Sequence, residues 1–265
     1  VRLGISKAKW FFTQDRYQRG GRWLELYAKA IKANAPPAVV VITDPQGSIL
    51  RNQDRRWSDL LSSDDELSIT ISSPDSTTTI LFSSGTTGSP KAIPWDHFSP
   101  VKCAIDGHLH QDIHPGDVVC WPTNLGWMMG PWLVYAALLN RACIAIYEGS
   151  PSSIDFCRFV EKNRVTMLGL VPSLVSAWKK SCALEGCDWS CIRTFSSTGE
   201  CSNVSDMEWL MGIAGGKPVI EYCGGTEVSG GYLTGTVIQP VYASMFSTPT
   251  LGTEFVILDN AGGKT

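Results

Sequence analysis

Apolar and polar residues alternate in blocks over the second two thirds of the chain, and the blocks predict strands and helices in turn. Apolar runs of strand length occupy residues 118–121, 142–147, 165–170, 191–195 and 219–223. Between them, residues 132–139, 153–161, 172–180 and 205–211 have the length or the spacing of helices. Strands that alternate with helices form βαβ units. We therefore expect an α/β fold with a largely parallel sheet.

Some of the predicted helices carry recognisable start signals. Ser153 and Ser205 are residue types that cap helix N-termini, and Pro172 suits the first position of a helix. We expect each of these three residues to mark the beginning of a helix.

The first 75 residues show a weaker pattern than the rest. Residues 1–35 predict helical or irregular structure, residues 38–42 a short buried strand and residues 57–61 a short helix. Residues 62–77 are rich in Ser, Asp and Thr and predict a loop. The change in pattern divides the chain into two expected parts, residues 1–75 and 76–265.

Composition excludes several classes of function. The 265 residues are 43% hydrophobic and 18% charged, as in an ordinary globular protein, and the net charge is −3. Without a basic stretch, nucleic-acid binding has no electrostatic support. We find neither an apolar run near the ~20 residues that span a bilayer nor a signal-peptide pattern. Nine scattered cysteines without a Cys-x-x-Cys pair fit a reducing intracellular compartment better than a disulfide scaffold.

The strongest chemical signal lies in residues 83–92, Ser-Ser-Gly-Thr-Thr-Gly-Ser-Pro-Lys-Ala, directly after the apolar run 78–82. Hydroxyls, glycines and a lysine that converge on one turn suit a polyphosphate. The spacing is not that of a Walker A loop. A flexible linker is the plain alternative, which the preceding strand and Pro90-Lys91 oppose.

Two more segments follow predicted strands, Ser197-Thr198-Gly199-Glu200 and Glu221-Tyr222-Cys223-Gly224-Gly225-Thr226-Glu227. Ligands in open α/β sheets bind beyond the carboxyl ends of the strands. We expect the three segments to meet in one crevice.

In this order the three segments resemble the motifs of the acyl-adenylate-forming enzymes, most closely the acetyl-CoA-synthetase-like plant acyl-activating enzymes. Ser83 stands where the family usually has Thr, and Ala92 where it has Gly. The resemblance covers most of residues 75–259. It implies that residues 76–265 are the AMP-binding core of a large domain and that residues 1–75 are the remainder of its first subdomain.

The resemblance implies a role for each motif. Lys91 and the loop Ser83, Ser84, Gly85, Thr86, Thr87 and Gly88 would hold the β- and γ-phosphates of ATP. Thr226 would contact the α-phosphate and Glu227 would bind Mg²⁺, whose preferred ligands are oxygens. Gly199 and Glu200 would lie against adenine, and Tyr222 near the base, within a nucleotide site that also includes Glu221, Cys223 and Gly225. From local sequence alone, a solvated carboxylate is favoured for Glu227 and a core aromatic for Tyr222, whereas a simple turn explains Gly199-Glu200 equally well.

The same resemblance suggests the acid. Acetate-activating members close their acyl pocket with a Trp at the position of Gly224, and Trp127, Met128 and Met129 match a pocket-lining segment. A missing indole leaves room for a medium-chain or aryl-alkanoic acid. The alternatives are that Gly224 only makes the turn and that the methionines belong to the core.

The resemblance also implies what the chain lacks. It ends before the family's ribose-binding Asp, hinge and C-terminal domain, and Lys264 is not in the context of the catalytic Lys. We expect an internal part of a longer protein, inactive by itself. The longer protein would use ATP and CoA to activate a carboxylic acid, in the peroxisome or cytoplasm. A non-catalytic nucleotide-binding module is the alternative.

One remaining cluster, His108, His110 and His114, has spacing compatible with a metal site. Pro115 follows directly, which favours a helix end instead.

Overall fold

The structure, a computed structural model, describes residues 1–19, 22–44, 46–61, 68–83 and 88–264. The chain forms two compact units. The first comprises Val1–Ser73 with the described part of Ser84–Ala92, and the second comprises Pro74–Ser83 and the residues from Ile93 onward.

The first unit is built on a small parallel sheet in the order β1-β4-β5, made of β1 (Phe11–Gln14), β4 (Ala38–Val41) and β5 (Arg55–Arg56). Its other elements are α1 (Arg2–Ser6), the antiparallel pair β2 (Arg16–Arg19) and β3 (Arg22–Glu25), α2 (Leu26–Lys32) and the 3₁₀ helix Trp57–Leu60. The predicted strand at 38–42 and the short helix at 57–61 are confirmed. The prediction for residues 1–35 is wrong over 11–14, 16–19 and 22–25, because pairing of β1 with the distant β4 and of β2 with β3 outweighs local preference.

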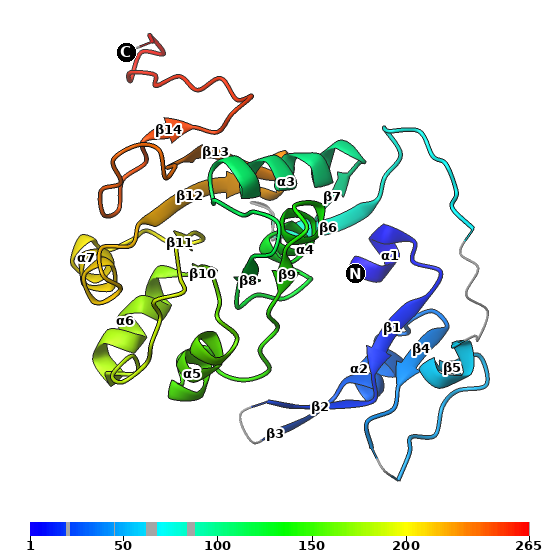
Figure 1. Ribbon diagram of the computed structural model, residues 1–265. Coiled ribbons are helices and arrows are strands. Elements are labelled where there is room, and N and C mark those ends of the chain that lie inside the picture. Colours follow the sequence, from blue (N-terminus) through cyan, green and yellow to red (C-terminus); the bar gives the residue numbers. More distant parts are fainter. Residues whose placement is uncertain (20–21, 45, 62–67, 84–87, 265) are drawn as a thin grey trace. The chain divides into compact units, whose positions relative to one another are not determined.

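The second unit has a seven-stranded sheet in the order β14-β13-β12-β11-β10-β8-β9 (Figure 1). Its strands are β8 (Val118–Cys120), β9 (Cys143–Ile144), β10 (Met167–Leu170), β11 (Thr194–Ser197), β12 (Val219–Gly225), β13 (Gly230–Thr234) and β14 (Thr248–Pro249). The five strands from β9 to β12 along the sheet are parallel, whereas β13 and β14 continue it antiparallel. The expected α/β fold with a largely parallel sheet is confirmed.

The helices of this unit are α3 (Phe98–Leu109), α4 (Met129–Leu139), α5 (Ile154–Lys162), α6 (Pro172–Ser181) and α7 (Val204–Ile213). A separate two-stranded sheet is formed by β6 (Thr79–Ser83) and β7 (Lys91–Trp95), and Thr226–Val228 forms a 3₁₀ turn after β12. Pro172 opens α6 as predicted, and the Ser153 hydroxyl accepts a hydrogen bond from the N–H of Phe156 at the start of α5. The predicted cap at Ser205 is wrong: α7 begins one residue after Asn203, whose side chain accepts from the first turn.

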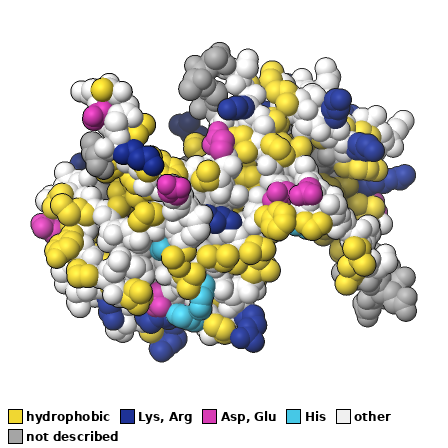
Figure 2. All heavy atoms as spheres, turned by 90° about the horizontal axis from the view of Figure 1, so that it is seen from above, with side chains coloured by type: hydrophobic (Ala, Val, Ile, Leu, Met, Phe, Trp, Pro, Cys, Tyr) yellow, Lys and Arg dark blue, Asp and Glu magenta, His cyan; other side chains and the backbone are white. Residues whose placement is uncertain are grey.

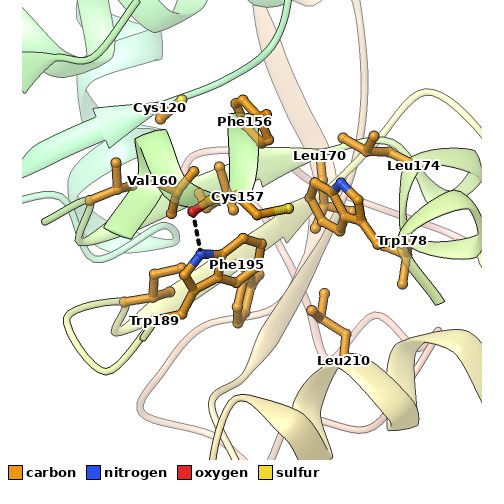
Figure 3. Packing of buried hydrophobic residues seen from close by; sticks show 14 of the residues in the cluster. Cys120, Phe156, Cys157, Val160, Leu170, Leu174, Trp178, Trp189, Phe195 and Leu210 are labelled. Carbon is orange, nitrogen blue, oxygen red and sulfur yellow. Dashed lines mark hydrogen bonds between the residues drawn. The ribbon is translucent and has the colours of Figure 1, made fainter. Parts of the chain in front are cut away.

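Alternating side chains of the parallel strands supply two hydrophobic cores, one on each face of the sheet. On one face, Cys120, Leu168 and Phe195 pack against α5, α6 and α7. Figure 3 shows this packing, including the hydrogen bond from the indole N–H of Trp189 to the carbonyl of Cys157. On the other face, Val119 and Met167 pack against α3 and α4. The sheet is therefore covered on both sides, which leaves its strand ends to carry polar groups.

The amino ends of three adjacent strands carry a closed polar network. The network is formed by the residue just before each strand: Asp117 before β8, Thr166 before β10 and Arg193 before β11. The Arg193 guanidinium donates to both carboxylate oxygens of Asp117, at 2.6 and 2.8 Å, and also to Asp112. The Thr166 hydroxyl donates to Asp117 at 3.0 Å.

In the described part of the chain, we find no helix long and apolar enough to cross a bilayer.

Candidate active site

A cavity of about 510 Å³ lies at the carboxyl ends of the parallel strands, and all of its walls come from the second unit. Its lining residues lie in or after the end of β12, after β8, β10 and β11, or at the start of α4, which is where ligands bind in open α/β sheets. The residues are Trp121, Pro122, Thr123, Asn124, Trp127, Met128, Met129, Val171, Thr198, Gly199, Glu200, Tyr222, Gly224, Gly225 and Thr226.

The cavity brings together two of the three sequence motifs. Gly199 and Glu200 line it from one side, and Gly224, Gly225 and Thr226 from another. The predicted acyl-pocket residues Trp127, Met128 and Met129 line it as well. Three residues of the last motif, Glu221, Cys223 and Glu227, are not among the lining residues, and neither are Ser83, Gly88 and Lys91.

The phosphate-loop motif is described only at its ends. Ser84, Gly85, Thr86 and Thr87 lie outside the described residues. Ser83 ends β6 in a half-buried position, and Lys91 is the exposed first residue of β7 and belongs to the first unit. Gly88 has a φ of +85°, a conformation that favours glycine. The role of this loop stays a prediction.

Glu200 is held in place by the helix that follows β10. Its carboxylate accepts hydrogen bonds from the backbone N–H and the hydroxyl of Ser173, at 2.9 and 3.1 Å, in the first turn of α6. A negative charge at a helix N-terminus is favourable. Because the side chain is turned to α6, the neighbouring Gly199, with a φ of +87°, can present bare backbone to the cavity.

Hydrogen bonds from two neighbouring segments fix the backbone of the last motif. The Thr198 hydroxyl donates to the carbonyl of Tyr222, and the indole N–H of Trp95 donates to the carbonyl of Thr226 at 2.7 Å. These bonds lie on either side of the Gly224-Gly225 pair. They hold the end of β12 rigidly against the cavity.

Tyr222 is among the lining residues, but it is 2% exposed and its side chain belongs to the core. The hydroxyl donates to Asp106 of α3 at 2.6 Å and accepts from the indole N–H of Trp132 at 3.0 Å. Burial, reinforced by the negative charge of Asp106, raises the pKa of Tyr222 well above its ordinary value. The phenol therefore stays protonated and anchors β12 to α3 and α4.

Glu221 points from the opposite side of β12, and only 4% of it is exposed. Burial raises the pKa of its carboxyl group, and hydrogen bonds from Ser202 and Ser197 offset only part of the rise. Its Oε1 atom has no hydrogen-bond partner among the described residues. A buried acceptor without a partner costs free energy, which a bound donor would recover.

Glu227 differs from Glu221 in being exposed. Its carboxylate accepts no hydrogen bond from the residues that the structure describes, and it follows the cavity-lining Thr226 directly. An exposed carboxylate without a protein partner is a suitable hard ligand for Mg²⁺. The residue therefore fits the ion that the motif implies.

Gly224 has a steric requirement that the sequence does not reveal. A Cβ atom at this position would lie 2.2 Å from the carbonyl oxygen of Gly230 and 3.0 Å from the Cα of Gly231, in β13. The register between β12 and β13 shifts at Cys223/Gly224, so the two backbones approach closely here. Glycine is needed for strand pairing at this position, and a Trp there would first disturb β13.

Sequence reasoning missed several lining residues, notably Trp121, Asn124 and Val171. Each follows the end of β8 or β10, so the rule that ligands bind at carboxyl ends could have indicated them. Thr198 was within a recognised motif but was not given a role.

The three histidines have structural partners. His110 Nδ1 lies 3.1 Å from the carbonyl of Gly235, and its Nε2 accepts from the N–H of Leu251 at 3.1 Å. His108 and His114 pack edge to face, and histidine side chains gather at the surface in Figure 2. Among the described residues, we find no group of three or more potential ligands placed to hold a metal ion. His110 is the C-cap of α3, in agreement with the helix-end interpretation.

Comparison with known proteins identifies relatives along the whole chain. The chain is 50% identical to the hexanoyl-CoA synthase of Cannabis sativa and 49% identical to the probable acyl-activating enzyme 17, peroxisomal, of Arabidopsis thaliana. The matches cover 99% and 98% of this chain but 37% of each relative. The acetoacetyl-CoA synthetase of Streptomyces lividans has the same fold, with a TM-score of 0.89 and 27% identity over the whole chain and 43% of that protein.

The family assignment rests on a match that is almost as long as the chain. Residues 2–265 match the profile of the family described as AMP-binding enzyme. The chain belongs to the AMP-binding enzyme family, and it spans about a third of the length of its curated relatives.

Proposed function

We propose that the protein containing this chain activates a carboxylic acid with ATP and transfers the acyl group to CoA. The acid's carboxylate oxygen attacks the α-phosphorus of ATP, and pyrophosphate leaves. The thiol of CoA then attacks the acyl carbonyl carbon, and AMP leaves. The observation that carries the proposal is the cavity in which the two ordered motifs and the Trp127–Met129 segment meet.

Each motif has a part in this proposal. The bare backbone of Gly199 offers a flat surface for adenine, whereas Glu221 is buried on the other side of β12 and does not line the cavity. The Thr226 side chain would contact the α-phosphate. Glu227 would hold Mg²⁺, which neutralises phosphate charge when bound. Lys91 and the phosphate loop would hold the leaving pyrophosphate.

We propose a medium-chain or aryl-alkanoic acid as the substrate rather than acetate. The half-buried Met128 and Met129 belong to the cavity wall and also pack on the core beneath it. Flexible thioether side chains adapt to apolar ligands of different shape. A relative with 50% identity bears the name hexanoyl-CoA synthase. The hexanoyl group in that name has the length of a medium-chain acid, as proposed here. Relatives whose names include "peroxisomal" support a peroxisomal location, with the cytoplasm as the alternative.

The test is exchange of pyrophosphate into ATP by the intact protein, stimulated by hexanoate. Glu227→Gln should lower the exchange rate about 100-fold or more, because it removes a ligand of the ion that stabilises charge in the transition state. Glu208→Gln, on the exposed face of α7, is the matched control and should leave the rate unchanged.

Two results would contradict the proposal. One is the failure of a broad panel of acids to stimulate exchange in the intact protein. The other is ATP binding that is normal but never followed by adenylate formation, which would favour a non-catalytic nucleotide-binding module.

A further inference from the structure

A second apolar cavity of about 320 Å³ lies next to the candidate active site. Its walls include Cys120, Leu133, Val134, Ala145 and Tyr147, none of which lines the first cavity. The two cavities share four consecutive lining residues, Trp121, Pro122, Thr123 and Asn124. This short segment, which follows β8, is therefore their common wall.

Trp121 is the buried side chain of the common wall. It is 5% exposed, whereas Pro122 is half-buried and Thr123 and Asn124 are exposed. The indole packs edge to face against Trp132, with 5.4 Å between ring centroids. Removing this side chain is the change that would open one cavity to the other.

Gly169 allows Trp121 to take this position. Residues 119 and 120 of β8 pair with 167 and 168 of β10, so Gly169 lies beside Trp121 on the same face of the sheet. A Cβ atom at Gly169 would lie 1.9 Å from Cδ2 of the indole. Only a residue without a side chain leaves room for the ring here. Gly169 therefore allows the Trp121 indole to stand in the wall between the two cavities.

We propose that Trp121 sets the upper limit on acyl-chain length by separating the substrate cavity from the second apolar cavity. This inference rests on the proposed function, because the chain end of a bound acid is what would meet the indole. A smaller residue at position 121 would let longer acids extend between Leu133, Val134 and Ala145. Trp121 is thus a specificity-determining residue and takes no part in the chemistry.

The experiment compares decanoate with hexanoate in the intact protein, as a ratio of kcat/KM values. Trp121→Ala should raise this ratio by about fourfold for each methylene that newly enters the second cavity. Val134→Phe fills that cavity from α4, so adding it to Trp121→Ala should return the ratio toward the wild-type value. Val134→Phe alone should leave the ratio unchanged, because Val134 does not line the substrate cavity.

A second readout needs no turnover. Decanoate should raise the melting temperature of Trp121→Ala more than hexanoate does, because the ligand that binds the folded state more tightly stabilises it more. If Trp121→Ala does not fold, Trp121→Leu retains an apolar side chain and replaces it in both measurements.

The proposal is overturned if a folded Trp121 variant keeps the wild-type ratio, or if Val134→Phe does not reverse a gain. Hexanoate-stimulated pyrophosphate exchange by the wild-type protein separates these failures from failure of the proposed function. If that exchange occurs and the Trp121 variants behave as wild type, only the chain-length inference is wrong.

Discussion

The polar residues at the two ends of the parallel strands in the second unit differ in whether the protein supplies their hydrogen-bond partners. At the amino ends, Asp117, Thr166 and Arg193 bind one another. The backbone N–H of His114 donates to Asp117, and Nε2 of its ring lies 2.8 Å from Oδ1 of Asp112. At the carboxyl ends, Glu227 accepts no hydrogen bond from the described residues. The Asp117 network is paired within the protein, whereas the Glu227 carboxylate is left available.

This difference separates structural polar residues from candidate ligands. Buried polar groups that are fully paired stabilise the fold, and adding a ligand there would break existing bonds. An exposed carboxylate and bare glycine backbone beside a cavity contribute little to stability and can exchange water for substrate. We therefore expect substitutions at the amino ends to affect stability and those at Glu227 to affect activity.

The largest expected loss of stability comes from Arg193→Ala. It leaves Asp117, 8% exposed at its side chain, without its bidentate partner. We expect the free energy of unfolding to fall by roughly 2 to 3 kcal/mol, less than for a fully buried pair because the guanidinium is itself partly exposed. Urea denaturation measures the change.

Arg158→Ala on the exposed side of α5 is the control, and Glu227→Gln should stay within about 0.5 kcal/mol of wild type. Equal losses in all three variants would remove the distinction between the two ends.

Gly224→Ala sharpens the comparison, because it lies at the carboxyl end but should affect stability. Its methyl group would contact the Gly230 carbonyl at 2.2 Å, so β13 must move. We expect a loss of about 1 to 3 kcal/mol in the free energy of unfolding. Gly225→Ala is the matched control, since its Cβ would meet only Glu227 Oε2, at 3.5 Å. If the two variants are equally stable, close approach of the backbones is not the reason for glycine at 224.

The smallest expected effect is the pH dependence that Asp117 confers. Burial acts to raise its pKa, but hydrogen bonds from Arg193, His114 N–H and Thr166 outweigh it and hold the pKa below the ordinary value. A lowered pKa means that the folded state favours the carboxylate. The stabilisation is therefore present above the unfolded pKa of about 3.9 and is lost as pH falls through the folded pKa.

Unfolding free energies of wild type and Asp117→Asn, measured from pH 7 down to pH 3, test this assignment. The difference between the two proteins should be constant from pH 7 to about pH 5 and should shrink below about pH 4. The control variant Glu208→Gln should follow wild type throughout. A difference that stays constant down to pH 3 would show that Asp117 does not gain stability from its charge.

The sequence allowed the second unit to be predicted better than the first. Strands 118–121 and 219–223 and the helices beginning at Ser153 and Pro172 have local signals, namely β-branched runs and capping residues. The strands at 11–14, 16–19 and 22–25 do not, because they form by pairing within the first unit. The antiparallel strands β13 and β14 were not anticipated for the same reason, since residues 230–234 are stabilised as a strand by pairing with β12 and β14.

By itself, the sequence determined the type of fold and the motifs from which the family can be recognised. Both depend on local order: hydrophobic periodicity over a few residues, and chemical groups spaced along one turn. Only the tertiary structure showed that Tyr222 uses its hydroxyl in the core and that Gly224 and Gly169 are required by a neighbouring backbone and an indole. Those facts depend on which atoms meet across strands far apart in the chain, and close packing makes such contacts decisive although no local pattern encodes them.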